Sequence, residues 1–245
     1  MSAVAIVPAR WASSRFPGKP LVEIAGVPML RRVVEGVRGA KRVRAVLVAT
    51  DDERIARACR GFGVEVRMTS PAHATGTDRL AEACRGLPDD IVVNVQGDEP
   101  LIEGFVVDAA VAALEESPEA AMSTVVHRAQ PGALEDPNRV KVVLDRRGFA
   151  LYFSRAPIPH RRAVGADAAV WQHVGLYAYR RAFLERFVAL EPTPLERAEA
   201  LEQLRALEHG HRIRAAVVEG WHGVPVDVPE DVARVEAALA ERAGR

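Results

Sequence analysis

The chain contains few lysines, cysteines and aromatic residues. Only three of its 33 basic residues are lysines (Lys19, Lys41 and Lys141), and the other 30 are arginines. Where arginine provides nearly all of the positive charge, a lysine indicates a position that requires a compact ammonium group. This favours a specific role for Lys19. The two cysteines, Cys59 and Cys84, stand in helix-like segments without neighbouring metal-ligating partners. We therefore expect two buried thiols in a reducing compartment.

The sequence also lacks a charge excess and long apolar runs. Its 33 basic and 33 acidic residues give a formal net charge of zero, which argues against the basic surface of a nucleic-acid-binding protein. No run of about 20 apolar residues could span a bilayer. The N-terminus has no basic segment followed by an apolar core, so we expect no signal peptide and a cytoplasmic protein. The 245 residues suffice for one α/β domain, with or without a small appended lobe.

Apolar runs and helical periods alternate through the first hundred residues. The predicted buried strands cover residues 3–7, 43–49, 64–68 and 91–95. The predicted helices cover residues 27–37, 53–60 (capped by Thr50 or Asp51) and about 80–84. This alternation is typical of a parallel sheet covered by helices. Loops that follow parallel strands share one edge of the sheet, where ligands bind, so the following loops should meet: 8–19, 50–52, 69–79 and 96–100.

The second half of the chain is richer in strands. The predicted strands cover residues 121–128, 139–153 with a hairpin turn at 145–148, 171–179 and 212–218. The predicted helices cover residues 182–190, 195–209 and 232–242. In the second of these helices Glu196 and Glu199 should be solvated, opposite a buried stripe of Leu195, Ala198, Leu201, Leu204 and Leu207. The simplest architecture is a nucleotide-binding core over about 1–120 and 210–245, with an inserted β-rich lobe over about 121–209.

The opening segment, AVAIVPARWASSRFPGKPL at 3–21, carries three cations in one loop after a buried strand. Each of Arg10, Arg15 and Lys19 could alone be an ordinary surface charge, but together they favour a polyanion site, such as one for a triphosphate. Gly18 and its flanking prolines exclude a regular helix here. The loop has no GxGxxG, and Pro20 follows Gly18 and Lys19, so it is not a P-loop. Side chains would therefore hold the phosphates.

Three further loops carry candidate residues. Residues 75–79 (TGTDR) precede a helix, where free amides suit an anion or a ribose, although a plain helix cap is equally compatible. Asp98 follows a buried strand and suits a hard divalent cation; Glu99 is the competing choice and a helix N-cap is the alternative. Residues 224–231 form a strand end before a capped helix. Spacing there does not distinguish Asp227 from Asp231.

The β-rich half should provide a second binding region. Arg155 follows a strand and could form a bidentate pair with a carboxylate. On the strand at 171–179, alternate residues share one face: His173, Gly175, Tyr177 and Tyr179. Core packing of these rings is the alternative. Glu202 and Gln203 lie at the margin of a helix, where they could reach hydroxyl groups.

The segment IVPARWASSRFPGKPL resembles the N-terminal signature of the 3-deoxy-manno-octulosonate cytidylyltransferases, the CMP-Kdo synthetases. The GTDR element at 76–79, NVQGDEP at 94–100 and the segment around Asp227 follow in the family's order, from Ile6 to Asp231. Val27 departs from the family, which more often has lysine there. The resemblance implies a Rossmann-like nucleotide-diphospho-sugar transferase fold, an α/β fold whose mixed sheet is mostly parallel. It also implies that CTP and Kdo react to CMP-Kdo and pyrophosphate, for lipopolysaccharide biosynthesis.

The resemblance also implies roles for individual residues. It makes Arg10, Lys19 and Asp98 catalytic, and Asp98 and Asp227 the ligands of Mg²⁺. The nucleotide-binding set that it implies is Ala9, Arg10, Arg15, Lys19, Thr75, Gly76, Thr77, Arg79 and Gln96. The sugar-acid-binding set is Gln96, Arg155, His173, Tyr177, Glu202 and Gln203. A homodimer is expected, with no nucleic-acid or membrane partner.

Three alternatives remain open from the sequence. The acceptor could be another 2-keto sugar acid, either 8-amino-Kdo or sialic acid. A nucleotidyltransferase for sugar 1-phosphates is weaker, because such an acceptor would require more cations in the second half. A non-catalytic nucleotide-binding regulator is the third, and the joint presence of Arg10, Lys19, Asp98 and Asp227 argues against it.

Overall fold

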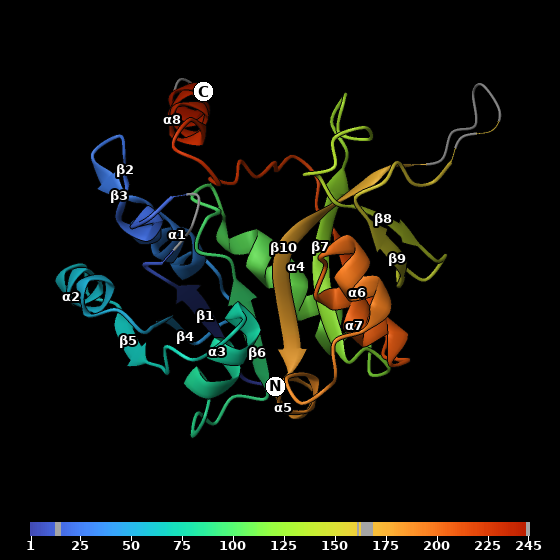
Figure 1. The fold of residues 1–245 in the computed structure, drawn as a ribbon, viewed down its shortest axis with the longest axis horizontal. Helices are drawn as coiled ribbons and strands as arrows, with labels where there is room; N and C mark the ends of the chain where they lie inside the picture. The colour runs from blue at the N-terminus through green and yellow to red at the C-terminus, as the bar shows by residue number, and fades with distance from the viewer. Residues whose placement is uncertain (13–15, 161, 163–168, 244–245) are drawn as a thin grey trace. The chain divides into compact units, whose positions relative to one another are not determined.

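The structure, a computed structural model, describes residues 1–12, 16–160, 162 and 169–243 (Figure 1). Contacts within the chain divide it into two compact units. Unit 1 comprises Met1–Asp108 and His222–Arg245, and unit 2 comprises Ala109–Trp221. The sequence analysis places these boundaries near residues 120 and 210.

Unit 1 contains four parallel strands in the order β6 (Ile91–Val95), β1 (Ala3–Ala9), β4 (Ala45–Thr50) and β5 (Glu65–Met68). The register pairs Val4 of β1 with Ala45 of β4 on one side and with Val92 of β6 on the other. β1 and β6 are buried along almost their whole length, as expected of parallel strands covered on both faces. The predicted alternation of strands and helices is confirmed, and so is the α/β class with a mostly parallel sheet.

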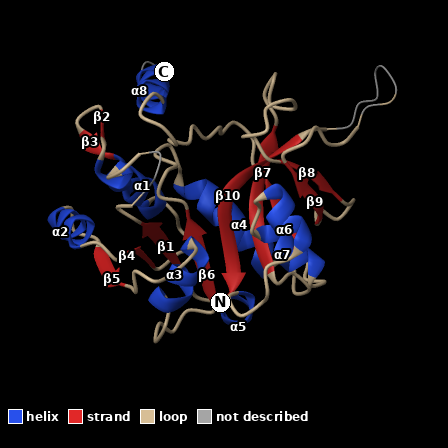
Figure 2. Cartoon of the chain, viewed as in Figure 1, coloured by secondary structure: helices blue, strands red, loops and turns tan. Residues whose placement is uncertain are grey.

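Helices flank these strands in unit 1, as Figure 2 shows. α1 (Met29–Arg38) and α3 (Gly76–Ala83) pack against β1 and β4, and α2 (Glu53–Gly61) packs against β4 and β5. α8 (Asp231–Ala243) packs against the small hairpin of β2 (Glu23–Ile24) and β3 (Val27–Pro28). Between β1 and this hairpin lies a short 3-10 helix, η1 (Lys19–Leu21).

Two local predictions in unit 1 are wrong. Asp52 caps α2 by accepting a hydrogen bond from the Arg54 amide, so neither Thr50 nor Asp51 is the cap. The helix predicted from residue 27 begins at Met29, because residues 27–28 pair with Glu23–Ile24 across a turn with positive φ at Ala25 and Gly26.

The sequence analysis missed the helix α4 (Gly104–Glu115). Several residues along this helix are fully buried, namely Val106, Val107, Ala110, Val111 and Leu114. A helix buried on most of its circumference shows no clear polar face, so the amphipathic period that reveals surface helices is absent. At its start, Gly104 is required, because a Cβ there would lie 2.1 Å from the backbone of Gly39.

Unit 2 is built around β10 (Trp171–Arg180), which pairs antiparallel with β7 (Met122–Arg128). β11 (Ile213–Val217) lies parallel to β7 on its other side. β8 (Lys141–Leu144) and β9 (Ala150–Ser154) form the predicted hairpin, whose turn is closed by the Asp145 carboxylate accepting from the amides of Arg147 and Phe149. The helices of the unit are α5 (Arg181–Phe187), α6 (Pro194–Glu199) and α7 (Gln203–Glu208).

The single helix predicted over 195–209 is wrong, because Ala200 adopts a left-handed conformation and separates α6 from α7. The predicted stripe is broken accordingly: Leu201 and Leu204 are buried, whereas Leu195 is 40% exposed. Glu196 and Glu199, predicted to be solvated, are both engaged. Glu196 forms an ion pair with the buried Arg205, and Glu199 accepts hydrogen bonds from β9.

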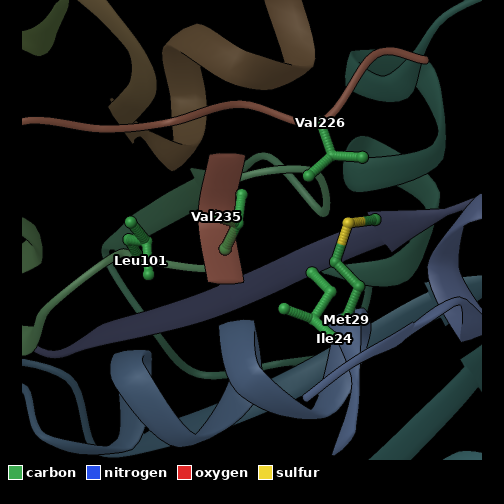
Figure 3. Close-up of a cluster of buried hydrophobic side chains, with 5 residues drawn as sticks. All are labelled: Ile24, Met29, Leu101, Val226 and Val235. Atoms are coloured by element: carbon green, nitrogen blue, oxygen red, sulfur yellow. The ribbon is translucent and has the colours of Figure 1, made fainter. Parts of the chain in front are cut away.

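A hydrophobic cluster in unit 1 joins segments that lie far apart in the sequence. Figure 3 shows its buried members: Ile24, Met29, Leu101, Val226 and Val235. The cluster fixes the segment that follows residue 221 against the N-terminal hairpin and the loop after β6. It therefore supports the backbone on either side of Asp98 and Asp227.

Both cysteines are buried, as predicted, and neither forms a disulfide in the described structure. Burial raises the pKa of the Cys59 thiol to about 12, so it is an inert core side chain. Among the described helices, none is both long and apolar enough to cross a membrane.

Candidate active site

The loops at the carboxyl ends of the unit 1 strands converge, as predicted. The loops 8–19 and 69–79 meet where Arg10 Nη1 donates to the Ala74 carbonyl at 3.1 Å. A Cβ on Gly97 would lie 3.1 Å from the Pro8 carbonyl oxygen, so glycine lets the loop after β6 approach the end of β1. Asp51, after β4, forms a 3.0 Å ion pair with Arg79 of α3. All four loops therefore share one edge of the sheet.

Lys19 is the charged centre of this edge. Its Nζ lies 2.9 Å from Asp98 Oδ2 and 3.9 Å from Asp227 Oδ1, and it donates to the Val226 carbonyl at 2.7 Å. Gly18 has a φ of 73°, packs against the Trp11 ring and starts the 3-10 helix that carries Lys19. The Lys19 ammonium thus contacts two acids that lie 79 and 208 positions further along the sequence, Asp98 and Asp227. The sequence predicts this convergence of the two acids.

The structure distinguishes Asp227 from Asp231. The Asp231 carboxylate accepts hydrogen bonds from the amides of Asp227 and Val228 and from Arg234, so it closes the turn that leads into α8. These bonds lower the pKa of Asp231, against the opposing effect of burial. The Asp227 side chain is 45% exposed and faces Lys19.

The pair of carboxylates fits a hard divalent cation. Asp98 and Asp227 already face one positive charge, the Lys19 ammonium, and both are partly accessible. Mg²⁺ takes one or two carboxylates and completes its octahedron with water and phosphate oxygens. In the part of the chain that the structure describes, no group of three or more His, Cys, Asp or Glu side chains is placed to hold a metal.

Glu99, the competing choice, lies beside this pair in a different environment. Burial raises the pKa of Glu99 to about 8, and the charges of Asp98 and Asp227 act in the same direction, while Lys19 opposes them. Its Oε2 is buried without a hydrogen-bond partner in the described structure. A carboxyl group that is mostly protonated at neutral pH is a poor ligand for Mg²⁺, which favours Asp98.

Other nucleotide-site candidates have structural partners. Thr75 and Asp78 form a capping box at the start of α3, and Thr77 is buried. Arg79 is fully buried, with its guanidinium on Asp51 and on the Thr69 hydroxyl. Gly76, at the same helix start, faces the Pro8 ring.

The remaining nucleotide-site candidates lie at the ends of β1 and β6. Ala9 ends β1 and is buried, and Gln96 follows β6 and is half-buried. Arg15 lies outside the described residues.

Trp11 and Arg54 form a feature of this edge that the sequence analysis missed. The Arg54 guanidinium carbon lies 3.6 Å from the centre of the Trp11 ring, and Arg54 also pairs with Asp52. A tryptophan inside a cationic loop was the available signal, because an indole face attracts a cation. The contact ties the loop 8–19 to the start of α2.

In unit 2, Arg155 is held by backbone carbonyls. Nε donates to Glu199 O at 2.8 Å, Nη1 to Pro137 O at 3.0 Å and Nη2 to Ala200 O at 3.4 Å. A guanidinium has five N–H donors, one on Nε and two on each terminal nitrogen. Among the residues that the structure describes, one donor thus remains on Nη1 and one on Nη2. A pair of donors on the two terminal nitrogens matches the two oxygens of a carboxylate.

His173, Tyr177 and Tyr179 share one face of β10, as predicted, despite a bulge between Val174 and Tyr177. The ring centres of His173 and Tyr177 are 5.3 Å apart, and those of Tyr177 and Tyr179 are 6.0 Å apart. The Thr124 hydroxyl donates to the Leu176 carbonyl, so its oxygen accepts the Nε2–H of His173 at 3.0 Å. This bond leaves Nδ1 as an acceptor. Burial lowers the pKa of His173 to about 3, so the ring is neutral.

Glu202 and Gln203 stand at the start of α7, near this face. The charge of Glu202 adds to the effect of burial in raising the pKa of Tyr177, which places the two side chains in one environment. Gln203 is 4% exposed, and its Nε2 is buried without a hydrogen-bond partner within the described structure. An unsatisfied buried amide is costly unless something supplies an acceptor, and a ligand hydroxyl would do so.

The edge of unit 1 therefore combines cations with a pair of carboxylates, the arrangement of a nucleotidyl-transfer site. Residues 4–213 match the family model for cytidylyltransferases. The chain is 54% identical to the 3-deoxy-manno-octulosonate cytidylyltransferase of Anaeromyxobacter sp. (strain Fw109-5), over 96% of each protein. It is 47% identical to the mitochondrial enzyme of that name from Arabidopsis thaliana, over 98% of this chain and 83% of the relative.

Solved structures give the same result. A structure of CMP:2-keto-3-deoxy-manno-octonic acid synthetase complexed with CTP is 40% identical to this chain, with a TM-score of 0.93 over 99% of this chain and 100% of that one. The chain is a cytidylyltransferase, an enzyme that transfers a cytidylyl group. Within that class, it belongs to the family of the 3-deoxy-manno-octulosonate cytidylyltransferases.

Proposed function

We propose that this protein transfers CMP from CTP to 3-deoxy-D-manno-octulosonate (Kdo), giving CMP-Kdo and pyrophosphate. The observation that carries the proposal is the convergence of Lys19, Asp98 and Asp227 at the carboxyl ends of the unit 1 strands. Relatives about half identical over nearly their whole length are named for this activity. The arrangement suits a triphosphate because it offers cations for the phosphates and acids for their metal.

The transfer exchanges one P–O bond for another. The anomeric hydroxyl oxygen of Kdo attacks the α-phosphorus of CTP in line and loses its proton, while the bond to the bridging oxygen breaks and pyrophosphate leaves with the electron pair. Such reactions depend mainly on positioning and on neutralising charge, so no covalent enzyme intermediate is needed. Lys19 and Arg10 would neutralise the charge that grows on the pyrophosphate.

Asp98 and Asp227 would hold Mg²⁺. When bound, the ion would polarise phosphate oxygens and lower the pKa of a hydroxyl near it. The chain's own part is to keep two carboxylates together, and Lys19 does so by pairing with both. Glu99, mostly protonated at neutral pH, would leave the pair to act alone.

The sugar acid would bind to the residues of unit 2; the family resemblance also predicts a contact with Gln96. The remaining N–H groups on Nη1 and Nη2 of Arg155 would donate hydrogen bonds to the carboxylate of Kdo. The neutral His173, Tyr177, Glu202 and the buried amide of Gln203 would bind its hydroxyl groups. The remaining nucleotide contacts are proposed for residues that end β1, follow β6 or start α3, namely Ala9, Thr75, Gly76, Thr77, Arg79 and Gln96, and for Arg15 as the family resemblance implies.

The setting of the reaction follows from the family resemblance. We expect a cytoplasmic homodimer whose product, an activated sugar acid, is consumed by glycosyl transfer in lipopolysaccharide biosynthesis. Light scattering of the purified chain would test the dimer.

A pyrophosphate-release assay over four nucleotides and three acceptors tests the function. With Mg²⁺, CTP should far exceed ATP, GTP and UTP, and Kdo should exceed 8-amino-Kdo and sialic acid. Faster release with sialic acid would keep the chemistry and change the acceptor. Nucleotide binding without release for any acceptor would overturn the proposal in favour of a regulator.

A further inference from the structure

Lys141 is a buried charge that plays no part in the proposed reaction. It is one of three lysines among 33 basic residues, it opens β8, and its side chain is fully buried. Its ammonium donates to the carbonyls of Asp136 at 2.9 Å and Arg155 at 2.6 Å. Burying an ammonium is costly unless its hydrogen bonds are made, so this placement indicates a role beyond surface charge.

The bonds of Lys141 converge on Arg155. Lys141 binds the carbonyl of Asp136, and the Arg155 guanidinium binds that of the next residue, Pro137, so both side chains hold one stretch of the loop before β8. Lys141 also binds the carbonyl of Arg155 itself. A single buried ammonium therefore fixes the backbone of Arg155 and that of Asp136, the neighbour of Pro137, whose carbonyl is one of the three that orient the Arg155 guanidinium.

Glu199 holds Arg155 from the opposite side. Its carboxylate accepts the Arg155 amide at 2.9 Å and the Ser154 hydroxyl at 2.6 Å, and its carbonyl accepts Nε of Arg155. These bonds, together with a contact from the Tyr152 hydroxyl, lower the pKa of Glu199, so it is ionised at neutral pH although burial acts in the other direction.

The chemistry of lysine suits this position better than that of arginine. An ammonium is compact and has three donors that can turn toward two carbonyls from different segments, whereas a guanidinium is planar and larger. In a fully buried space between β8, the loop at 136 and Arg155, the extra atoms of arginine would displace the backbone. This accounts for one of the lysines retained in an arginine-rich chain.

We propose that Lys141 is a positioning residue for Arg155: it fixes the arginine so that its free Nη1 and Nη2 donors meet the carboxylate of the acceptor, with Glu199 bracing the other side. The inference rests on the proposed function, in which Arg155 binds the sugar acid. Lys141 touches neither substrate. Its loss should therefore act on the acceptor and leave CTP binding unchanged.

The test compares Lys141→Met with Lys41→Met, because Lys41 is an exposed lysine outside both sites. Lys141→Met should raise the KM for Kdo by about ten- to hundredfold, the scale expected when a binding group is no longer held in the correct orientation. It should change the KM for CTP less than about twofold. Lys41→Met should change neither. Lys141→Arg should not rescue Kdo binding. Equal KM values for Kdo in Lys141→Met and wild type would overturn the proposal, as would equal rises for both substrates.

Two further variants cover a failure of Lys141→Met to fold. Lys141→Gln keeps an N–H donor for one carbonyl, and Glu199→Gln keeps one of two acceptor oxygens. Both should raise the KM for Kdo, by less than Lys141→Met, and unchanged values would overturn the proposal.

Calorimetric titration with Kdo separates this inference from the proposed function. Wild type that binds Kdo but releases no pyrophosphate would refute the proposed function, and weaker Kdo binding by Lys141→Met would still support the inference. If wild type bound no Kdo, both would be refuted.

Discussion

The two units of the molecule hold their functional charges in different ways. In unit 1, Lys19 neutralises Asp98 and Asp227, and the three come from separate loops and remain partly accessible. In unit 2, Lys141 and Arg155 are held mainly by backbone carbonyls, inside or against the hairpin of β8 and β9. Under the proposed function, the first arrangement would exchange one ionic partner for another when a triphosphate and its metal bind. The second would present a donor pair that is fixed before the ligand binds, which would lower the entropic cost of binding.

If this contrast holds, the largest effect should come from the charge in unit 1. Lys19→Met should lower kcat by about 10²–10³, the range seen when one group that stabilises developing charge is removed. The KM for Kdo should change little, because Lys19 acts on the nucleotide. Steady-state pyrophosphate release at saturating CTP measures the effect.

Lys41→Met is the matched control for Lys19→Met, since it removes an exposed ammonium from a turn. It should retain full activity. A Lys19→Met enzyme with wild-type kcat but a raised KM for Kdo would reverse the roles assigned to the two units.

The next effect should come from the packing that supports the site of unit 1. Leu101 is buried in the cluster of Figure 3, which also contains Val226, the residue before Asp227. Leu101→Ala should lower the free energy of unfolding by about 3 kcal/mol, through lost burial and the remaining cavity. Urea denaturation would measure it. Leu151→Ala, at a side chain that is 61% exposed, should cost less than about 0.5 kcal/mol. Equal losses would show that the cluster adds nothing specific.

The same contrast explains what the sequence could predict. Strands such as Ile91–Val95 are continuous apolar runs, and the rule that parallel strands end at one edge suffices to bring Lys19, Asp98 and the TGTDR loop together. Choosing Asp227 over Asp231 required the resemblance or the structure, because either carboxylate could bond the backbone where α8 begins. Only the structure shows that Asp231 accepts the amides of Asp227 and Val228.

In unit 2 the sequence was a weaker guide. The break between α6 and α7 is at Ala200, a left-handed residue that is not a glycine, and α4, which spans residues of both units, has no polar face to reveal it. Lys141 was missed as a functional residue because its partners are backbone carbonyls, which carry no signature in the sequence. Glu199 was missed because the hydroxyls and the amide that it accepts lie 44 to 47 residues away in the sequence. The scarcity of lysine was the one signal available for Lys141, and we applied it only to Lys19.

A smaller effect should come from the donor pair of unit 2. Arg155→Lys keeps the positive charge but loses the pair of donors on the two terminal nitrogens of the guanidinium. The KM for Kdo should therefore rise about 10- to 100-fold, as expected when a charge-assisted hydrogen bond of about 1.5–3 kcal/mol is lost. The KM for CTP should stay constant. Arg146→Lys, at an exposed position in the turn of the hairpin, provides the control. A change in kcat alone would contradict the role of Arg155 in binding.

The smallest effect concerns His173, and it tests whether unit 2 is fixed in a neutral state. Its pKa is about 3 in the folded protein and about 6.5 in an unfolded chain, so between these values only the unfolded chain binds the proton. Stability should therefore fall as the pH drops below about 6.5, by at most about 1.4 kcal/mol per pH unit from this residue, and this contribution is complete above that pH.

His173→Gln should remove that part of the slope, because a glutamine amide can still donate to Thr124 but does not titrate. Urea unfolding at pH 6.5 and pH 5 would measure the slope, with His160→Gln as a control at an exposed histidine. A wild-type slope in His173→Gln would mean that the ring is protonated in the folded protein. The face of β10 would then carry a positive charge. Both units would bind their ligands through ion pairs, so the contrast drawn between the ionic unit 1 and the neutral face in unit 2 would no longer hold.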